Sequence, residues 1–252
     1  LWVSTTGNDT TGNGTISKPY ATIGKAHSLA NKGDVIKVTP GTYTESVVIE
    51  KAVEISSTAG PTQTVLRSAS KASAVFCRGA GVHGGKLIGF TLTGGGGANS
   101  SSYNRYGGGF AMNAPAGTTF EVKHCIIRNN TDSGITFGGG FHVTGGSTLK
   151  LTNSLVHSNA AWANGGAALI EGANLIADRC TIVSNTNNGF NRIGGISAAG
   201  NCNIQIKNSI LWNNSTNQYG SFSSGPGGNA TFSFSYSNIQ GRHHRHHRRQ
   251  HE

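Results

Sequence analysis

The segment Cys125-Ile-Ile-Arg-Asn-Asn130 decides the fold, because three related segments follow it along the chain. They are Ser154-Leu-Val-His-Ser-Asn159, Cys180-Thr-Ile-Val-Ser-Asn185 and Ser209-Ile-Leu-Trp-Asn-Asn214. The four segments begin at positions 125, 154, 180 and 209, so the spacing is 29, 26 and 29 residues. A period of about 20 to 50 residues is typical of repeat proteins in which each unit stacks on the next.

Two further features recur in the same register. An apolar pair lies five and three residues before each segment, which is the alternation of a β-strand. The pairs are Phe120 and Val122, Leu149 and Leu151, Leu175 and Ala177, and Ile204 and Ile206. Each repeat also contains two glycines followed by an apolar or small residue, at Gly108-Gly109-Phe110, Gly139-Gly140-Phe141, Gly165-Gly166-Ala167 and Gly194-Gly195-Ile196.

A unit of this length with strand periodicity cannot bury its apolar side alone and must stack on copies of itself. The sequence therefore predicts an all-β, single-domain right-handed parallel β-helix solenoid with a short N-terminal capping helix. In such a solenoid Asn130, Asn159, Asn185 and Asn214 lie above one another at a turn. Stacked amides can hydrogen-bond along the axis, and Asn tolerates the left-handed backbone of sharp corners. We interpret the four asparagines as a structural ladder.

The four cysteines contain no CxxC pair and no His spacing typical of a zinc site. In the repeat register Cys125 and Cys180 share an inward column with Ser154 and Ser209. They are two rungs, roughly 9.6 Å, apart. Because a disulfide needs a closer approach, we expect buried free thiols.

The first part of the chain has a different pattern. Ile23, Ala26 and Ala30 recur at helical spacing, and Gly33 follows as a candidate C-terminal cap. A helix before the first rung would hide the apolar end of the solenoid. Strands are expected at 35–38, 47–49, 53–55 and 64–66. The predicted organisation is an N-terminal strand and capping helix over 1–34, β-helix rungs over 35–241, and a disordered His/Arg-rich tail over 242–252.

A Gly, Ser and Asn loop interrupts the repeats from Gly94 to Gly107. It contains Tyr103, Arg105 and Tyr106. Loops held on a rigid scaffold often bind ligands, so these three residues are candidate ligand-binding residues.

The net charge of +10 limits the choice of partners. Without the tail from Arg242 to Glu252 the chain retains 16 basic and 9 acidic residues, a charge of +7. A basic surface favours anionic partners. No RNA- or DNA-reading motif is present and the basic residues are scattered, which argues against nucleic acid. No apolar run is long enough to cross a bilayer, and a start at Leu1 is compatible with removal of a targeting segment.

Several stretches together resemble known families. The N-terminal stretches are Leu1-Trp-Val-Ser-Thr-Thr-Gly-Asn-Asp9, Pro19-Tyr-Ala-Thr-Ile-Gly-Lys-Ala-His27, Gly33-Asp-Val-Ile-Lys-Val38 and Gly41-Thr-Tyr-Thr-Glu45. They resemble the N-terminal segment of pectate-lyase-like right-handed β-helix proteins, over roughly the first 66 residues. The repeats from 107 to 214 are similar to those of polymorphic outer-membrane-protein-like sequences. These resemblances imply an extracellular or cell-surface location, with adhesive, structural and polysaccharide-acting relatives.

An enzyme of the lyase branch is the alternative that the resemblance leaves open. Such enzymes use a Lys or Arg base and a calcium ion held by clustered Asp and Glu. The chain has ten acidic residues and they form no cluster in the sequence, so we predict no metal site and no cofactor. A pectin-methylesterase-like motif of the type Asp-Phe-Ile-Phe-Gly is absent as well. A calcium-free site using His124, His142 or Lys150 with Arg179 remains open.

Glycoside hydrolysis would need two facing carboxyl groups. Glu121 and Asp178 are expected on one outward strip, but Lys123 and Lys150 lie between them. That order is typical of a ladder of opposite charges.

The residue three places after each repeat start is Arg128, His157, Val183 or Trp212. The preceding residue is always apolar, so these side chains should point outward. A Trp in line with Arg and His suits sugar stacking and pairing with acid groups, although a neighbouring loop or subunit could also cover such a face.

The sequence thus favours a non-catalytic extracellular module, adhesive or structural, that contacts carbohydrate. A polysaccharide lyase or other carbohydrate-active enzyme of the pectate-lyase-like superfamily is the alternative, and an ice-binding solenoid a third. The expected partners are acidic or neutral polysaccharide, other extracellular proteins, or further copies joined end to end.

Overall fold

The computed structural model describes residues 1–252 apart from 71, 97–106, 132–136, 190–191, 223–228 and 242–252. Tyr103, Arg105 and Tyr106, and the basic tail over 242–252, lie outside the described residues.

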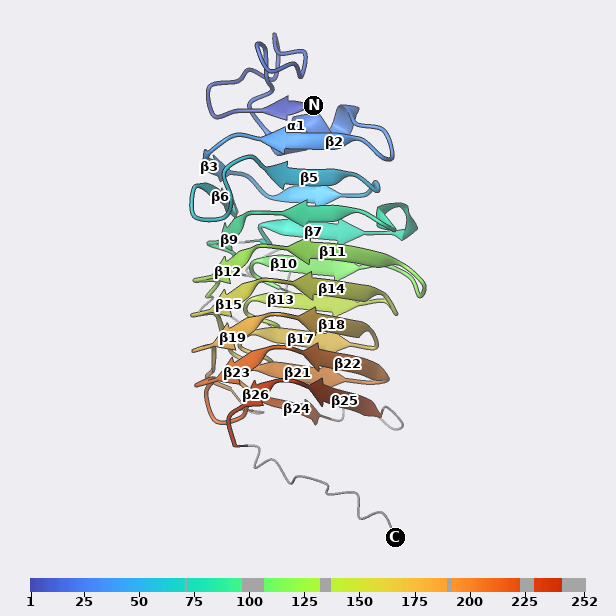
Figure 1. Ribbon diagram of the computed structural model, residues 1–252, viewed down its shortest axis with the longest axis vertical. Helices are drawn as coiled ribbons and strands as arrows, with labels where there is room; N and C mark the ends of the chain where they lie inside the picture. Colours follow the sequence, from blue (N-terminus) through green and yellow to red (C-terminus); the bar gives the residue numbers. More distant parts are fainter. Residues whose placement is uncertain (71, 97–106, 132–136, 190–191, 223–228, 242–252) are drawn as a thin grey trace.

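The chain winds into a parallel β-helix with three sheets along its axis (Figure 1). Sheet I has nine strands: β1 (Trp2–Val3), β2 (Val35–Val38), β5 (Glu54–Ser57), β8 (Lys86–Ile88), β11 (Thr119–Lys123), β14 (Thr148–Thr152), β18 (Asn174–Asp178), β22 (Cys202–Lys207) and β25 (Ala230–Ser235). Sheet II has eight: β3 (Gly41–Thr44), β6 (Thr64–Arg67), β9 (Thr91–Thr93), β12 (Ile126–Arg128), β15 (Leu155–His157), β19 (Thr181–Val183), β23 (Ile210–Trp212) and β26 (Asn238–Ile239).

Sheet III has seven strands: β4 (Val47–Ile49), β7 (Val75–Arg78), β10 (Phe110–Asn113), β13 (Phe141–Thr144), β17 (Ala168–Glu171), β21 (Ile196–Ala199) and β24 (Tyr219–Phe222). A small fourth sheet joins β16 (Ala160–Ala161) to β20 (Thr186–Asn187), and a 3-10 turn, η1, spans Ala80–Val82. From β2 onward the chain passes from sheet I to II to III in each turn, so each of these strands pairs with the equivalent strand one turn later. At the start of the chain, β1 pairs directly with β2. The predicted all-β solenoid is therefore confirmed.

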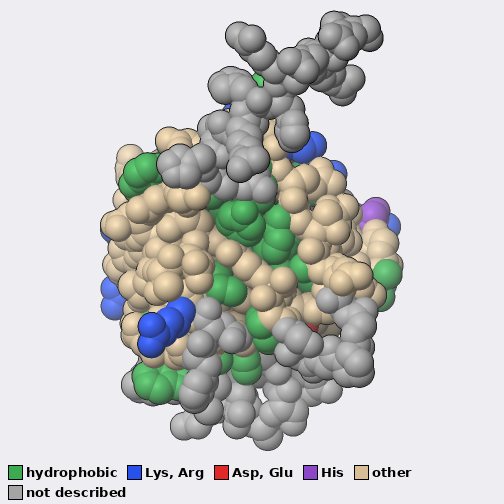
Figure 2. All heavy atoms as spheres, turned by 90° about the horizontal axis from the view of Figure 1, so that it is seen from below, with side chains coloured by type: hydrophobic (Ala, Val, Ile, Leu, Met, Phe, Trp, Pro, Cys, Tyr) green, Lys and Arg blue, Asp and Glu red, His purple; other side chains and the backbone are tan. Residues whose placement is uncertain are grey.

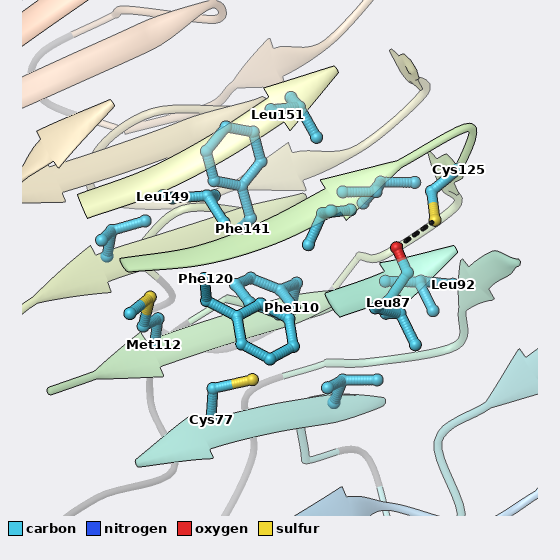
Figure 3. Packing of buried hydrophobic residues seen from close by; sticks show 14 of the residues in the cluster. Cys77, Leu87, Leu92, Phe110, Met112, Phe120, Cys125, Phe141, Leu149 and Leu151 are labelled. Atoms are coloured by element: carbon cyan, nitrogen blue, oxygen red, sulfur yellow. Dashed lines mark hydrogen bonds between the residues drawn. The ribbon is translucent and has the colours of Figure 1, made fainter. Parts of the chain in front are cut away.

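The core is a stack of inward side chains, one layer per turn. Phe120, Leu149, Leu175 and Ile204 occupy one register column of sheet I, and all are fully buried. Phe110 of sheet III packs against Phe120, with ring centroids 5.9 Å apart, and Figure 3 shows both rings in the interior. Each such side chain contributes about 1.5 to 3 kcal/mol of burial free energy. Because no single turn encloses its own core, every turn depends on its neighbours.

A column of buried asparagine amides runs along the corner between sheets II and III. The Nδ2 of Asn130 donates to the Oδ1 of Asn159 at 2.9 Å, that of Asn159 to Asn185 at 2.9 Å, and that of Asn185 to Asn214 at 2.8 Å. Each Nδ2 also donates to a main-chain carbonyl of the preceding turn. The ladder thus satisfies polar groups that the buried corner would otherwise leave unpaired.

The residue before each ladder asparagine has left-handed backbone, with φ between 52° and 55°. These residues are Asn129, Ser158, Ser184 and Asn213. The ladder continues beyond the repeats at one end, where Asn214 Nδ2 donates to Gln218 Oε1 at 2.7 Å. At the other end the N–H of Gly95 donates to Asn130 Oδ1 at 3.0 Å.

Helix α1 (Ile23–Leu29) lies at the N-terminal end of the solenoid (Figure 1). Two carboxylates hold its start: Glu45 accepts hydrogen bonds from the N–H groups of Ile23 and Gly24 at 2.8 and 2.9 Å, and Asp9 accepts from Ala21 at 2.7 Å. The helix ends at Leu29, and its C-cap is Ala30 rather than the expected Gly33. Gly33 instead has φ 92° and donates its N–H to Ala52 O at 2.7 Å, which starts the turn into β2.

All four cysteines are free and buried. The repeat register predicted this for Cys125 and Cys180. The N–H groups of Cys125 and Cys180 donate to the hydroxyls of Ser154 and Ser209, at 3.1 and 3.0 Å. Burial raises the pKa of the Cys125 and Cys180 thiols to about 11.

We predict that replacing Asn185 with Ala lowers the free energy of unfolding by about 2 to 4 kcal/mol, because buried groups of both neighbouring turns lose their partners. The measurement is urea denaturation followed by circular dichroism. The matched control is Asn203→Ala, an exposed asparagine on sheet I, which should change stability by less than about 0.5 kcal/mol. Equal effects of the two changes would refute the structural importance of the ladder.

We also predict that none of the four thiols reacts with a thiol reagent near pH 8 in the native protein, because all four are buried. For Cys77, Cys125 and Cys180, burial also raises the pKa, which disfavours the reactive thiolate. All four should react after denaturation, as counted by mass spectrometry. Rapid labelling of one thiol in the native state would contradict the buried columns.

Candidate functional site

The outer face of sheet II carries a column that we call the basic strip: Arg128, His157, Val183 and Trp212. Strand pairing places Arg128 beside His157, His157 beside Val183, and Val183 beside Trp212. Their preceding residues, from Ile127 to Leu211, are fully buried, so the strip points outward. The Trp212 side chain is 45% exposed.

A second outward column lies beside the basic strip, at Ile126, Leu155, Thr181 and Ile210. It borders an open groove of about 450 Å³ at the corner between sheets I and II, which we call the corner groove. His124, Asn153 and Arg179 line its polar side, all with left-handed backbone. Arg179 Nε donates to Asn153 Oδ1 at 2.8 Å, so its guanidinium is held in place at the rim. The face therefore combines apolar surface with fixed hydrogen-bond donors.

Charge separates sheet II from sheet I. The strands of sheet II, all within the described part of the chain, contain Arg67 and Arg128 but neither Asp nor Glu. The outer face of sheet I instead alternates charges, with Glu121 between Lys86 and Lys150. The strands of sheet I carry five Lys and three Asp or Glu, so opposite charges at strand spacing compensate part of the positive charge there. Sheet II leaves its positive charge uncompensated.

His157 lies next to Arg128 in the basic strip. Burial and the neighbouring positive charge of Arg128 both lower its pKa. The imidazole is thus neutral at pH 7, and its Nδ1 lies 3.0 Å from Ser158 Oγ. A ligand with negative charge would favour its protonation.

The residues considered for a calcium-free active site are spread over the molecule. His124 and Arg179 both line the corner groove. Lys150 lies on the outer face of sheet I, opposite Glu121, and His142 lies on sheet III. Asp178 is bound by Arg179 Nη2 at 3.0 Å and by Asn208 Nδ2 at 2.8 Å, so it does not face Glu121 as one of two free carboxylates.

The structure also forms a pair that the sequence analysis missed. His142 Nε2 lies 3.3 Å from Glu171 Oε2, although only 2% of the histidine side chain is exposed. Burial lowers the pKa of His142, and the hydrogen bond from His142 lowers the pKa of Glu171. Extending the repeat register to sheet III would have placed the two residues on adjacent turns, since Val143 pairs with Ile170.

Among the described residues, no three or more His, Cys, Asp or Glu side chains gather in a way that could hold a metal ion. In the same part of the chain, no helix has the length and apolar character needed to span a membrane.

Comparisons with known proteins agree with this architecture. A family model described as a protein of unknown function (DUF1565) matches residues 5–55. No curated protein matches the sequence.

Solved structures share the fold at low sequence identity. Escherichia coli YbhC matches with a TM-score of 0.60 and 14% identity, covering 95% of this chain and 71% of YbhC. The pectin methylesterase of Aspergillus niger matches with a TM-score of 0.53 and 16% identity, over 96% of this chain and 85% of the enzyme. Pectate lyase Pel9A matches at 0.53 and 12%, over 95% and 77%. The chain is therefore a right-handed parallel β-helix of the kind found in pectin methylesterase and pectate lyase structures.

Proposed function

We propose that this protein is an extracellular β-helix module, adhesive or structural, that binds acidic polysaccharide on the outer face of sheet II. The observation that carries the proposal is the basic strip on a sheet without a single acidic residue. The names of the structural neighbours support it, since pectin and pectate are acidic polysaccharides.

The chemistry of the face fits a sugar polymer. The half-exposed indole of Trp212 offers a flat apolar surface on which a sugar ring can stack, with its N–H free to reach a hydroxyl. Arg128 presents a planar fork that matches a carboxylate. The strip repeats once per turn at roughly 4.8 Å. A linear polymer running along the axis can therefore contact successive turns with successive sugars.

The second candidate is a polysaccharide lyase or other carbohydrate-active enzyme. One feature favours it: the buried His142, neutral at pH 7 and in contact with Glu171, has the character of a general base. Depolymerisation of polygalacturonate, assayed in parallel with binding, distinguishes the candidates. If the protein depolymerises polygalacturonate and His142→Gln abolishes that activity, the protein is an enzyme rather than a non-catalytic module.

We predict that Trp212→Ala weakens binding to polygalacturonate about tenfold, because the stacking surface contributes on the order of 1.4 kcal/mol. Isothermal titration calorimetry measures the affinity. Trp162→Ala is the matched control, since Trp162 is equally exposed at 47% but lies outside sheet II. Arg128→Ala should weaken binding to polygalacturonate more than binding to a neutral polymer. If both tryptophan variants bind as the parent does, sheet II is not the binding face.

We further predict that affinity for polygalacturonate rises as pH falls from about 7.5 to about 5, where uronate carboxylates with pKa near ~4 remain ionised. His157 has a lowered pKa, so it is neutral at the upper limit and gains a positive charge as the pH falls through that pKa. His157→Gln should remove most of this dependence. The measurement is the dissociation constant at constant ionic strength across the range, and an unchanged slope in the variant would exclude His157 as its source.

A further inference from the structure

The corner groove has two walls of different chemistry. In the view along the solenoid axis, hydrophobic side chains gather near the centre and the visible Lys and Arg side chains lie away from it (Figure 2). The groove is an apolar exception at the surface, because the outward side chains of Ile126 and Leu155 form a half-buried floor. Its other wall is polar and consists of His124, Asn153 and Arg179. A ligand in the groove therefore packs on one side and hydrogen-bonds on the other.

The groove is closed at its N-terminal end. The hydroxyl of Thr91, one turn before the floor, donates to Pro61 O at 2.7 Å, and Thr91 is only 1% exposed. A Cβ on Gly89, one turn before the polar wall, would lie 3.5 Å from Gly60 Cα. The loop between β5 and β6 thus packs over both columns at this end. A closed end suits the terminal residue of a chain or branch better than the middle of a polymer.

Arg179 is fixed in the polar wall with part of its guanidinium open to a ligand. Its Nε donates to Asn153 Oδ1 at 2.8 Å, and its Nη2 lies 3.0 Å from Asp178 Oδ2. Within the described part of the chain no hydrogen bond or ion pair engages Nη1, so its N–H groups remain as donors. Asn208 Nδ2 donates to Asp178 Oδ1 at 2.8 Å and holds that carboxylate at the corner. Asp178 therefore compensates the positive charge of these donors.

The backbone at Arg179 supports a role for this side chain. Its φ is 54°, in the left-handed region that glycine adopts freely and long side chains adopt rarely. In the same corner column Gly89 has φ 81°, so the corner accepts a glycine. An arginine at this position costs conformational energy that a glycine would not. Such outliers are frequent at functional sites.

We propose that the corner groove binds the terminal residue of a neutral sugar chain or branch. The ring packs on Ile126 and Leu155, and neighbouring hydroxyl oxygens accept hydrogen bonds from Arg179. A volume of about 450 Å³ is within the usual range of small-molecule sites. Charge favours a neutral sugar over a uronate, because Asp178 compensates Arg179, whereas no acidic residue lies on the sheet that carries the basic strip. The groove is a separate site, so the proposal does not require uronate binding by that strip.

The first test is a titration followed by the amide resonances of the protein. The probes are the methyl glycosides of galactose, glucose, mannose, rhamnose, xylose and arabinose, together with that of galacturonate. One or more neutral sugars should bind with a millimolar Kd and shift the resonances of Ile126, Leu155 and Arg179, and galacturonate should bind no more tightly than galactose. If no neutral sugar shifts these resonances, or if galacturonate binds more tightly, the proposal is overturned.

The second test removes the arginine fork. Arg179→Gly should weaken binding of the best neutral sugar about tenfold, because the ligand loses hydrogen bonds from a charged donor, while glycine retains the left-handed corner. Ser184→Gly, at an exposed residue of the same turn with φ 55°, is the matched control and should bind as the parent does. Arg179→Lys keeps the charge and lacks the planar fork, so it should also weaken binding. Unchanged binding in either Arg179 variant refutes the assigned contact.

The closed end and the independence of the two sites are tested on the same samples. A disaccharide of the best-binding sugar should bind more tightly than its long linear polymer at equal concentrations of sugar residues, and equal binding would refute a site for chain ends. Polygalacturonate binding is measured in parallel. If polygalacturonate binds and no neutral sugar does, only the corner site is refuted, whereas the reverse result refutes only the role of the basic strip.

Discussion

The hydrogen bonds from one asparagine amide to the next fix the corner between sheets II and III, and other features of the structure depend on that corner. Asn130, Asn159, Asn185 and Asn214 sit where the backbone has just taken a left-handed step. A side chain that both donates and accepts can serve the turn above and the turn below at once. The amide hydrogen bonds therefore hold successive turns in register. Equivalent residues of the repeats then form continuous columns, although the repeat is weak in sequence.

Those columns explain how one scaffold presents faces of different character. On sheet I, acidic and basic residues are mixed, and Glu121 compensates part of the charge of its neighbours Lys86 and Lys150. On sheet II, the next residues in the column of Arg128 are His157 and Val183, and neither is acidic. The positive charge of Arg128 is therefore not compensated within the column. The core behind both faces is the same stack of apolar side chains. Selection can therefore change the outer column of one sheet without disturbing the packing that supports it.

Repeat spacing predicted the columns because strands one turn apart are paired residue by residue, and the same spacing predicted buried free thiols at Cys125 and Cys180. Spacing could not predict the C-cap of the helix, which is Ala30. The N–H of Gly33 instead donates to the carbonyl of Ala52, a tertiary hydrogen bond that no local pattern shows. Spacing also did not reveal the contact between His142 and Glu171, which runs diagonally between adjacent turns. Alignment in columns shows which residues are stacked, but not which side chains reach sideways.

The unequal repeat lengths have a consequence for how such a chain can change. Nine positions separate Asn130 from Gly139 and Asn185 from Gly194, but six separate Asn159 from Gly165. The ladder bonds on either side of the shorter turn are both 2.9 Å, so the missing three residues leave the ladder intact. The difference in repeat length is thus confined to the segment between the ladder asparagine and the glycine pair. That stretch is a natural insertion point, where a turn can acquire a new loop while its neighbours keep their register.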